Sequence, residues 1–349
     1  MTSQRTDGER PDADRSDRIR TGRPILRRPG PVADRSFLES GPVSRFAHHG
    51  IDPIGSAGHY DAFLLVELPL PWGRDLFDDL ALCELEEAVT EAVRNGVRWR
   101  ILGLVPPGED PTPSSQVICY RRGECGFTVF ERSEGYVPSA ALAHVCAEIV
   151  AGAELTEPTP VGDGHPCRDV LICTHGRRDR RCGSMGARLY EAADGRYGDS
   201  RVWRISHTGG HRFAPTAITF PEGMFWAHLD LPTLDGIVSR GIEPRAIGSH
   251  YRGGGAYEQM AQPAEREAFV LHGWDWLAHV KAAEVIGTDE HDRCEVRLLH
   301  RAPDGSEGAY EATVGVGRLV PTVNCDTDCH DPDARSEELQ IFRFARVDV

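Results

Sequence analysis

The chain has 349 residues, of which 40% are hydrophobic, and its formal net charge is −15 at pH 7. This length suffices for about two domains with extensions, and no apolar run approaches the roughly 20 residues that span a membrane. The negative charge argues against nucleic acid or an anionic membrane as a partner. The N-terminus has no apolar stretch of the kind found in secretion signals, which predicts a cytoplasmic protein.

Four segments are expected along the chain. Residues 1–45 mix Arg, Asp, Pro, Ser and Gly with few apolar groups, which predicts a disordered tail. Residues 46–155 form a first module, residues 156–255 a second module, and residues 256–349 an appended extension.

The first module reads strand, helix, strand, strand, strand, helix. Hydrophobic runs predict its strands at 62–68, 99–105, 116–122 and 126–132. Apolar residues at helical spacing predict a helix within 75–96, and Ser139 is placed to cap a closing helix.

The second module repeats this order. Its strands are expected at 168–174, 201–206, 216–220 and 224–230, and its helices within 184–195 and 231–241. The extension is expected to hold a helical region at 256–280, a hairpin turning at Asp304-Gly305 and a last strand at 339–347. The fold class predicted is therefore α/β, with two tandem β-α-β-β-β-α modules and a C-terminal α+β extension.

Two loops of the second module carry possible metal ligands. Cys173 and Cys182 flank one loop, and the next strand ends in HTGGH, with His207 and His211 four residues apart. Two glycines within a helix would cost roughly 1 kcal/mol each relative to alanine, so HTGGH is expected to form a tight loop. The carboxyl ends of neighbouring parallel strands lie side by side, so the two loops should converge. Two thiolates and two imidazoles suit zinc or an iron–sulfur cluster.

The remaining cysteines are less informative. Ten cysteines without an export signal favour reduced thiols over a disulfide framework. Cys325 and Cys329 form either a second metal half-site, a redox pair or an ordinary loop. Six others are expected to be core or surface residues without a ligand role: Cys83, Cys119, Cys125, Cys146, Cys167 and Cys294.

The motifs resemble a known family. CTHGRRDRRC, followed by HTGGH and RFAPT, is similar to the sucrase/ferredoxin-like family, and PW at 71–72 and YRGG at 251–254 resemble stretches of its bacterial members. The resemblance covers about residues 58–275. It implies a thioredoxin-like ferredoxin fold for the second module, and the repeated element order extends a degenerate thioredoxin-like fold to the first. Pro215 stands at the position where thioredoxin folds keep a cis-proline. The resemblance also implies a [2Fe–2S] cluster held by four residues of the second module alone: Cys173, Cys182, His207 and His211.

The function expected from this resemblance is electron transfer between unidentified donor and acceptor proteins. Two alternatives stay open: a structural zinc protein that uses the same four residues, and a thiol–disulfide oxidoreductase. Any enzyme activity would be that of an oxidoreductase. Glycoside cleavage is not expected, because nothing in the sequence marks a facing pair of carboxylates.

Overall fold

The structure is a computed structural model that describes residues 50–78, 82–105, 113–123, 126–155, 168–322 and 334–348. The predicted tail at 1–45 and the pair Cys325 and Cys329 lie outside the described residues. All described residues belong to one compact unit, Val32–Val349. Within the described ranges, no helix is both long enough and apolar enough to cross a membrane.

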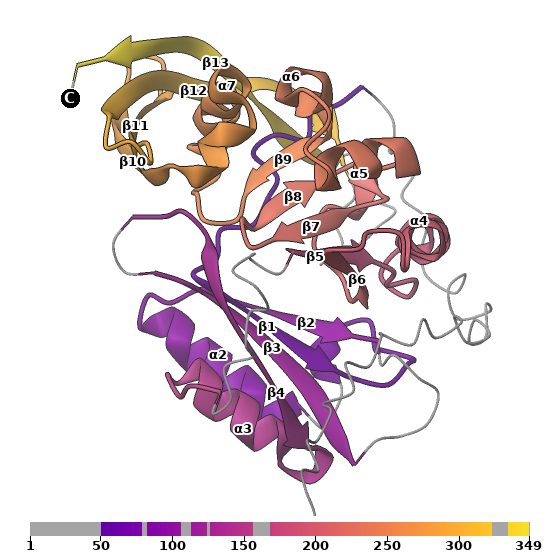
Figure 1. The fold of residues 1–349 in the computed structure, drawn as a ribbon. Coiled ribbons are helices and arrows are strands. Elements are labelled where there is room, and N and C mark those ends of the chain that lie inside the picture. The colour runs from indigo at the N-terminus through magenta and orange to yellow at the C-terminus, as the bar shows by residue number, and fades with distance from the viewer. Residues whose placement is uncertain are drawn as a thin grey trace, which may run out of the picture. The chain divides into compact units, whose positions relative to one another are not determined.

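The first half of the chain forms one end of a large mixed sheet. Its elements are β1 (Ala62–Glu67), α2 (Cys83–Arg94), β2 (Trp99–Leu104), β3 (Ser114–Arg122), β4 (Phe130–Pro138) and α3 (Leu142–Val150). Strand β1 pairs with β2 in parallel and with β3 antiparallel, and β3 pairs with β4. Helices α2 and α3 lie side by side on one face of these strands (Figure 1).

The second half repeats this arrangement. Its elements are β5 (Arg168–Cys173), α4 (Ala187–Ala193), β6 (Ser200–Ile205), β7 (Ala217–Phe220), β8 (Met224–Trp226) and α5 (Leu231–Val238). Strand β5 pairs with β6 in parallel and with β7 antiparallel, so both halves place their strands in the order fourth, third, first, second. The predicted α/β class is confirmed, because both halves combine helices with strands of one mixed sheet.

Strands β2 and β6 join the two halves into one nine-stranded sheet, in the order β4-β3-β1-β2-β6-β5-β7-β8-β9. The joint is short, because the two strands pair only at Leu104 and Ile205. Two further hydrogen bonds support it: Val105 N–H donates to the Arg204 carbonyl (3.0 Å), and Ser206 N–H donates to the Gly103 carbonyl (2.9 Å). The carboxyl end of β6 therefore lies against the end of β2.

The rest of the chain adds one edge strand and a second sheet. Strand β9 (Tyr251–Gly254) pairs with β8, and α6 (Pro244–Ile247) and α7 (Gln262–His272) flank it in sequence. The second sheet is antiparallel, and its strands are β10 (Val280–Thr288), β11 (Cys294–Arg301), β12 (Glu307–Pro321) and β13 (Arg335–Val347). The hairpin predicted at Asp304-Gly305 is confirmed, because this turn joins β11 to β12.

Several predicted boundaries are wrong. The strand expected at 126–132 is β4, which begins at Phe130, because the N–H and carbonyl of Phe127 pair instead with Lys281 of β10 (2.7 and 2.8 Å). The helix expected within 75–96 is confirmed as α2, which spans Cys83–Arg94 after a 3-10 turn at Leu76–Asp78. The strand expected at 224–230 ends at Trp226, and Ser139 opens a 3-10 turn instead of capping a helix. Strands β9 and β10 were not predicted.

Successive side chains of β1 point alternately into two different hydrophobic cores. Ala62, Leu64 and Val66 point to the side of α2 and α3, whereas Phe63 and Leu65 point into a core shared with the second half and the antiparallel sheet. This is the period-2 pattern of a strand buried on both faces. Cys119 and Cys146 are fully buried on the helix side, which confirms that they pack as small hydrophobic residues.

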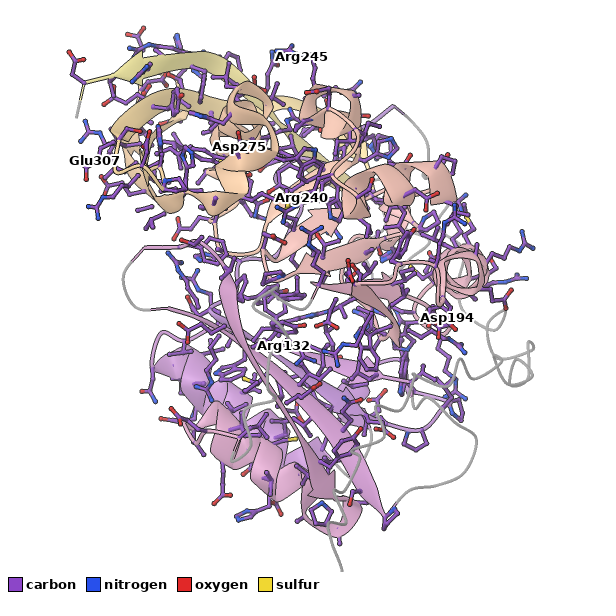
Figure 2. All side chains as sticks on the ribbon, in the orientation of Figure 1. Arg132, Asp194, Arg240, Arg245, Asp275 and Glu307 are labelled. Atoms are coloured by element: carbon purple, nitrogen blue, oxygen red, sulfur yellow. The ribbon has the colours of Figure 1, made fainter. Side chains whose placement is uncertain are left out.

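A buried carboxylate links the two halves. Asp169 of β5 is fully buried, and its Oδ1 accepts hydrogen bonds from Trp203 Nε1 (2.8 Å) and Arg201 Nε (3.0 Å) of β6. Its Oδ2 accepts hydrogen bonds from the Tyr120 hydroxyl of β3 and from Arg132 Nε of β4 (2.9 Å; Arg132 is labelled in Figure 2). One carboxylate therefore satisfies four donors from three strands.

Candidate metal centre

Three side chains converge where β5 and β6 end. Cys173 is the last residue of β5, Cys182 opens the π-helical turn Cys182–Gly186 that leads into α4, and His207 follows β6. One ligand atom from each lies within 4.8 Å of the other two. The parallel pairing of β5 with β6 sets Cys173 opposite Ile205 and so brings the two loops together.

His211 lies outside this three-residue group. It opens the 3-10 turn His211–Phe213, and its side chain is buried. Its ring centroid lies 5.5 Å from that of His207, at an interplanar angle of 42°. Of the four ligands that the sequence analysis expected, the structure therefore groups three and places the fourth beside the histidine of that group.

A buried arginine packs against the two glycines between the histidines. Gly209 and Gly210 have φ values of +81° and +66°, which favour glycine. Arg252 of β9 donates from Nη1 to the Gly209 carbonyl (3.1 Å) and from Nη2 to the Ser56 carbonyl (2.6 Å). A Cβ added at Gly210 would lie 2.4 Å from Arg252 Nη2. The loop needs Gly210 because of this close approach, and sequence reasoning missed Arg252 although it lies within the YRGG motif.

The Cys182 thiol donates a hydrogen bond to Cys173, and this bond shifts the pKa values of the two thiols in opposite directions. The pKa of the Cys173 thiol is lowered to about 7, first by the hydrogen bond that the Cys182 thiol donates to it and further by the backbone N–H groups of His175 and Thr208. Burial acts in the opposite direction on Cys173, because it disfavours a thiolate. The pKa of Cys182 is raised, because Cys173 holds its proton and its surroundings are buried. Cys173 is therefore the thiol that loses its proton more readily, and binding of a metal to both sulfurs would release protons from the pair.

His207 is suited to bind a metal as a neutral imidazole. Burial holds its pKa well below the ordinary value, and the positive charges of His211 and Arg100 act in the same direction. Its Nδ1 is buried and has no hydrogen-bond partner among the described residues. Arg100 donates a hydrogen bond to the His207 carbonyl, which fixes the backbone of the loop. An imidazole nitrogen without a partner beside two thiols fits a transition-metal ion.

His175 connects the ligand loop to the first half of the chain. Its side chain is buried, its Nε2 donates to the Gly73 carbonyl (2.8 Å), and its ring meets Trp72 edge-on with centroids 5.5 Å apart. Burial lowers its pKa to about 4. His175 therefore positions the loop that leads to Cys182, and the Pro-Trp motif supplies its contact.

Gly186 is required for the approach of α4 to β5. A Cβ at this position would lie 2.0 Å from the Cys173 carbonyl oxygen. We expect Gly186→Ala to lower the free energy of unfolding by about 1–3 kcal/mol, because the helix must move away from the strand. Gly198→Ala, where nothing lies within 4 Å of the added Cβ, is the matched control and should leave urea unfolding nearly unchanged. Equal stability of the two variants would contradict this close approach.

Comparison with known proteins gives one family and two relatives. A family model described as "Sucrase/ferredoxin-like" matches residues 53–253, more than half of the chain. A protein of Meyerozyma guilliermondii named "Altered inheritance of mitochondria protein 32" is 34% identical over 94 residues, which cover 24% of this chain and 33% of that protein. The protein of the same name from Eremothecium gossypii is 27% identical over 112 residues, which cover 27% and 36%. The chain thus spans about a third of the length of these relatives. No solved structure matches it.

These comparisons overturn the predicted function. The relatives are named for mitochondrial inheritance and not for iron–sulfur electron transfer, and the family match does not establish a [2Fe–2S] role. The prediction of an electron-transfer protein is therefore wrong. Thiol and imidazole donors accept several metals, so electron transfer does not follow from the donor set.

Proposed function

The chain belongs to the sucrase/ferredoxin-like family, and we propose that it is a metal-binding protein whose centre is formed by Cys173, Cys182 and His207. The observation that carries the proposal is that one ligand atom of each residue lies within 4.8 Å of the others. Two observations support it: His207 Nδ1 has no hydrogen-bond partner in the part of the chain that the structure describes, and the pKa of Cys173 is lowered. Both leave a lone pair available to a metal.

His211 is the proposed fourth ligand. Its ring is adjacent to that of His207, and burial lowers its pKa to about 4, which keeps the imidazole neutral. A metal bound at this centre would neutralise the thiolates and link the end of β5, the start of α4 and the loop after β6. The chain's own contribution is to hold these segments together through Arg252, His175 and the close approach at Gly186.

The occupant of the centre is a separate proposal. A [2Fe–2S] cluster is the occupant that the sequence analysis expects, with zinc as the alternative. Both take thiolate and imidazole ligands, so the donor set supports either one. Elemental analysis distinguishes them, because only the cluster brings iron and acid-labile sulfide.

We further propose that both halves of the large sheet are thioredoxin-like modules and that only the second holds the metal. The shared strand order of the two halves supports this proposal. Residues 68–74, which follow β1 as the ligand loop follows β5, contain neither Cys nor His.

A cytoplasmic location, without nucleic acid or membrane as partner, is proposed from the net charge of −15 and from the free thiols of the core.

Cobalt(II) titration of the metal-free full chain tests metal binding. We expect about one cobalt ion per chain, with the visible absorption of tetrahedral cobalt(II) and an added thiolate-to-cobalt charge-transfer band. The charge-transfer band should disappear in the Cys173→Ser/Cys182→Ser variant. Binding without that band in the unaltered chain would show that the cysteines are not ligands, and it would contradict the proposal.

A further inference from the structure

A cavity of about 520 Å³ lies beside the candidate metal centre. Gly210, His211 and Arg212 line one side of it, and β13 lines another with Ser336 and Leu339. This volume lies within the range of small-molecule binding sites. The balance of charge around the cavity indicates which class of ligand it suits.

Arg212 is fixed in the cavity wall by neutral groups. Its Nη1 donates to Thr322 Oγ1 (2.7 Å) and its Nη2 to Ser336 Oγ (3.1 Å). Its guanidinium carbon lies 4.5 Å from the centroid of the Phe213 ring. Among the described residues, no carboxylate forms an ion pair with Arg212. Two hydroxyls and a ring therefore orient the guanidinium without an ion pair among the described residues, and N–H donors remain for a ligand.

The acidic groups nearest to Arg212 are already paired. Asp52, which lines the cavity, accepts hydrogen bonds from Arg266 Nη1 at both carboxylate oxygens (2.7 and 2.8 Å). Glu338 accepts hydrogen bonds from Arg318 Nε (2.7 Å) and Nη2 (3.0 Å). The negative charge of Glu338 also acts on Arg212, but the hydrogen bonds of this carboxylate go to Arg318 and to the Asp52 N–H.

A second arginine lies behind the cavity wall. Arg252 is fully buried, and it donates to the Gly209 carbonyl (3.1 Å) and the Ser56 carbonyl (2.6 Å), next to the lining residues Gly210 and Ser56. Arg335 and Glu337 also line the cavity, but both are exposed and their charges oppose each other. Arg212 and Arg252 are therefore two positive charges fixed by partly or fully buried contacts at this wall.

We infer that this cavity binds a small oxyanion, a carboxylate or a phosphate group, through Arg212. The planar guanidinium presents parallel N–H groups that match two oxygens of such a ligand. The hydroxyls of Thr322 and Ser336 hold this fork in place before the ligand arrives, which lowers the entropy lost on binding. The bound anion lies in the cavity that His211 lines, and its binding does not depend on whether the neighbouring centre holds a metal.

Isothermal titration of the purified full chain at low ionic strength tests the inference. The probes are inorganic phosphate, citrate as the carboxylate, and sorbitol as a neutral molecule. We expect at least one of the two anions to bind with a dissociation constant below about 10 mM, and sorbitol not to bind. The anion that binds more tightly identifies the ligand as a phosphate or as a carboxylate. Failure of both anions to bind would overturn the inference.

Variants of Arg212 decide where the anion binds. Arg212→Gln is expected to weaken binding at least tenfold. Arg212→Lys is expected to weaken it less, because lysine keeps the positive charge but lacks the paired N–H donors of the planar guanidinium. Arg301→Gln is the matched control. Arg301 ends β11 and pairs with Glu307, which opens β12 and is labelled in Figure 2, so this variant should bind the anion as the unaltered chain does. If Arg212→Gln does not fold, Arg212→Lys decides alone, and unchanged affinity in that variant would overturn the inference. The metal content of each variant is measured as well, so that a loss of anion binding is distinguished from a loss of metal.

Discussion

Replacement of Cys182 by serine is expected to weaken metal binding by about two orders of magnitude. Cys182 supplies one of the three grouped ligand atoms, and a serine hydroxyl does not deprotonate to bind a metal near neutral pH. Structural zinc sites with four ligands contribute about 10–16 kcal/mol, or about 3 kcal/mol for each ligand, and this corresponds to roughly a 100-fold loss of affinity. Competition between the metal-free chain and a chromophoric zinc chelator measures the change.

Cys294→Ser provides the matched control for this prediction. Cys294 lies on β11, is partly buried as a free thiol and is not one of the grouped ligands. Its replacement should leave the zinc affinity unchanged. Equal affinities of the Cys182 and Cys294 variants would show that Cys182 is not a ligand.

Replacement of Asp169 by asparagine is expected to cause the largest loss of stability. The asparagine amide would place an N–H₂ group where the carboxylate now accepts two hydrogen bonds, and Arg132 and Arg201 would lose a buried counter-charge. Removing one partner of a buried ion pair costs about 3–5 kcal/mol, and the ion pairs that both arginines keep with Glu134 place the expected loss at the lower end of this range. In a chain of 349 residues this loss corresponds to a fall in melting temperature of roughly 4–7 °C. Urea unfolding followed by circular dichroism measures the free energy directly.

Asp235→Asn is the control for Asp169→Asn. Asp235 also accepts hydrogen bonds from an arginine and a tyrosine, Arg196 (2.7 and 2.8 Å) and Tyr197 (2.8 Å). Its side chain is 33% exposed, whereas that of Asp169 is 1% exposed. An exposed pair of this kind contributes less than about 1 kcal/mol, so the control should be nearly as stable as the unaltered chain. The account of the joint between the halves fails if the two variants lose the same stability.

One rule of sheet geometry connects the local patterns that indicated a metal centre. Cys173 ends the hydrophobic strand β5 and His207 follows β6, and the parallel pairing of these two strands brings their carboxyl ends together. The glycines of the HTGGH loop likewise indicated a close approach. The sequence could not identify the approaching group, because Arg252 lies on an edge strand 41 residues after His211 and reaches the loop only through the pairing of β8 with β9.

The missed elements follow from tertiary contacts that override local preference. Strand β10 begins VKAAE, a composition that favours a helix, yet it is extended because it pairs with β11 along its length. Asp169 is similar: it is a charged residue near the start of a hydrophobic strand, and only the side chains of β3, β4 and β6 make its burial favourable. In both cases the deciding partners lie far away in the sequence.

Elemental analysis of the full chain purified without oxygen tests the central claim most directly. The measurement determines zinc, iron and acid-labile sulfide per chain, for the unaltered protein and for the Cys173→Ser/Cys182→Ser variant. The metal centre predicts that the unaltered chain retains either about one zinc ion or iron and sulfide in equal amounts, and that the variant retains neither. An unaltered chain that contains no metal, or a variant that retains the same metal content, would contradict the claim that Cys173, Cys182 and His207 form a metal centre.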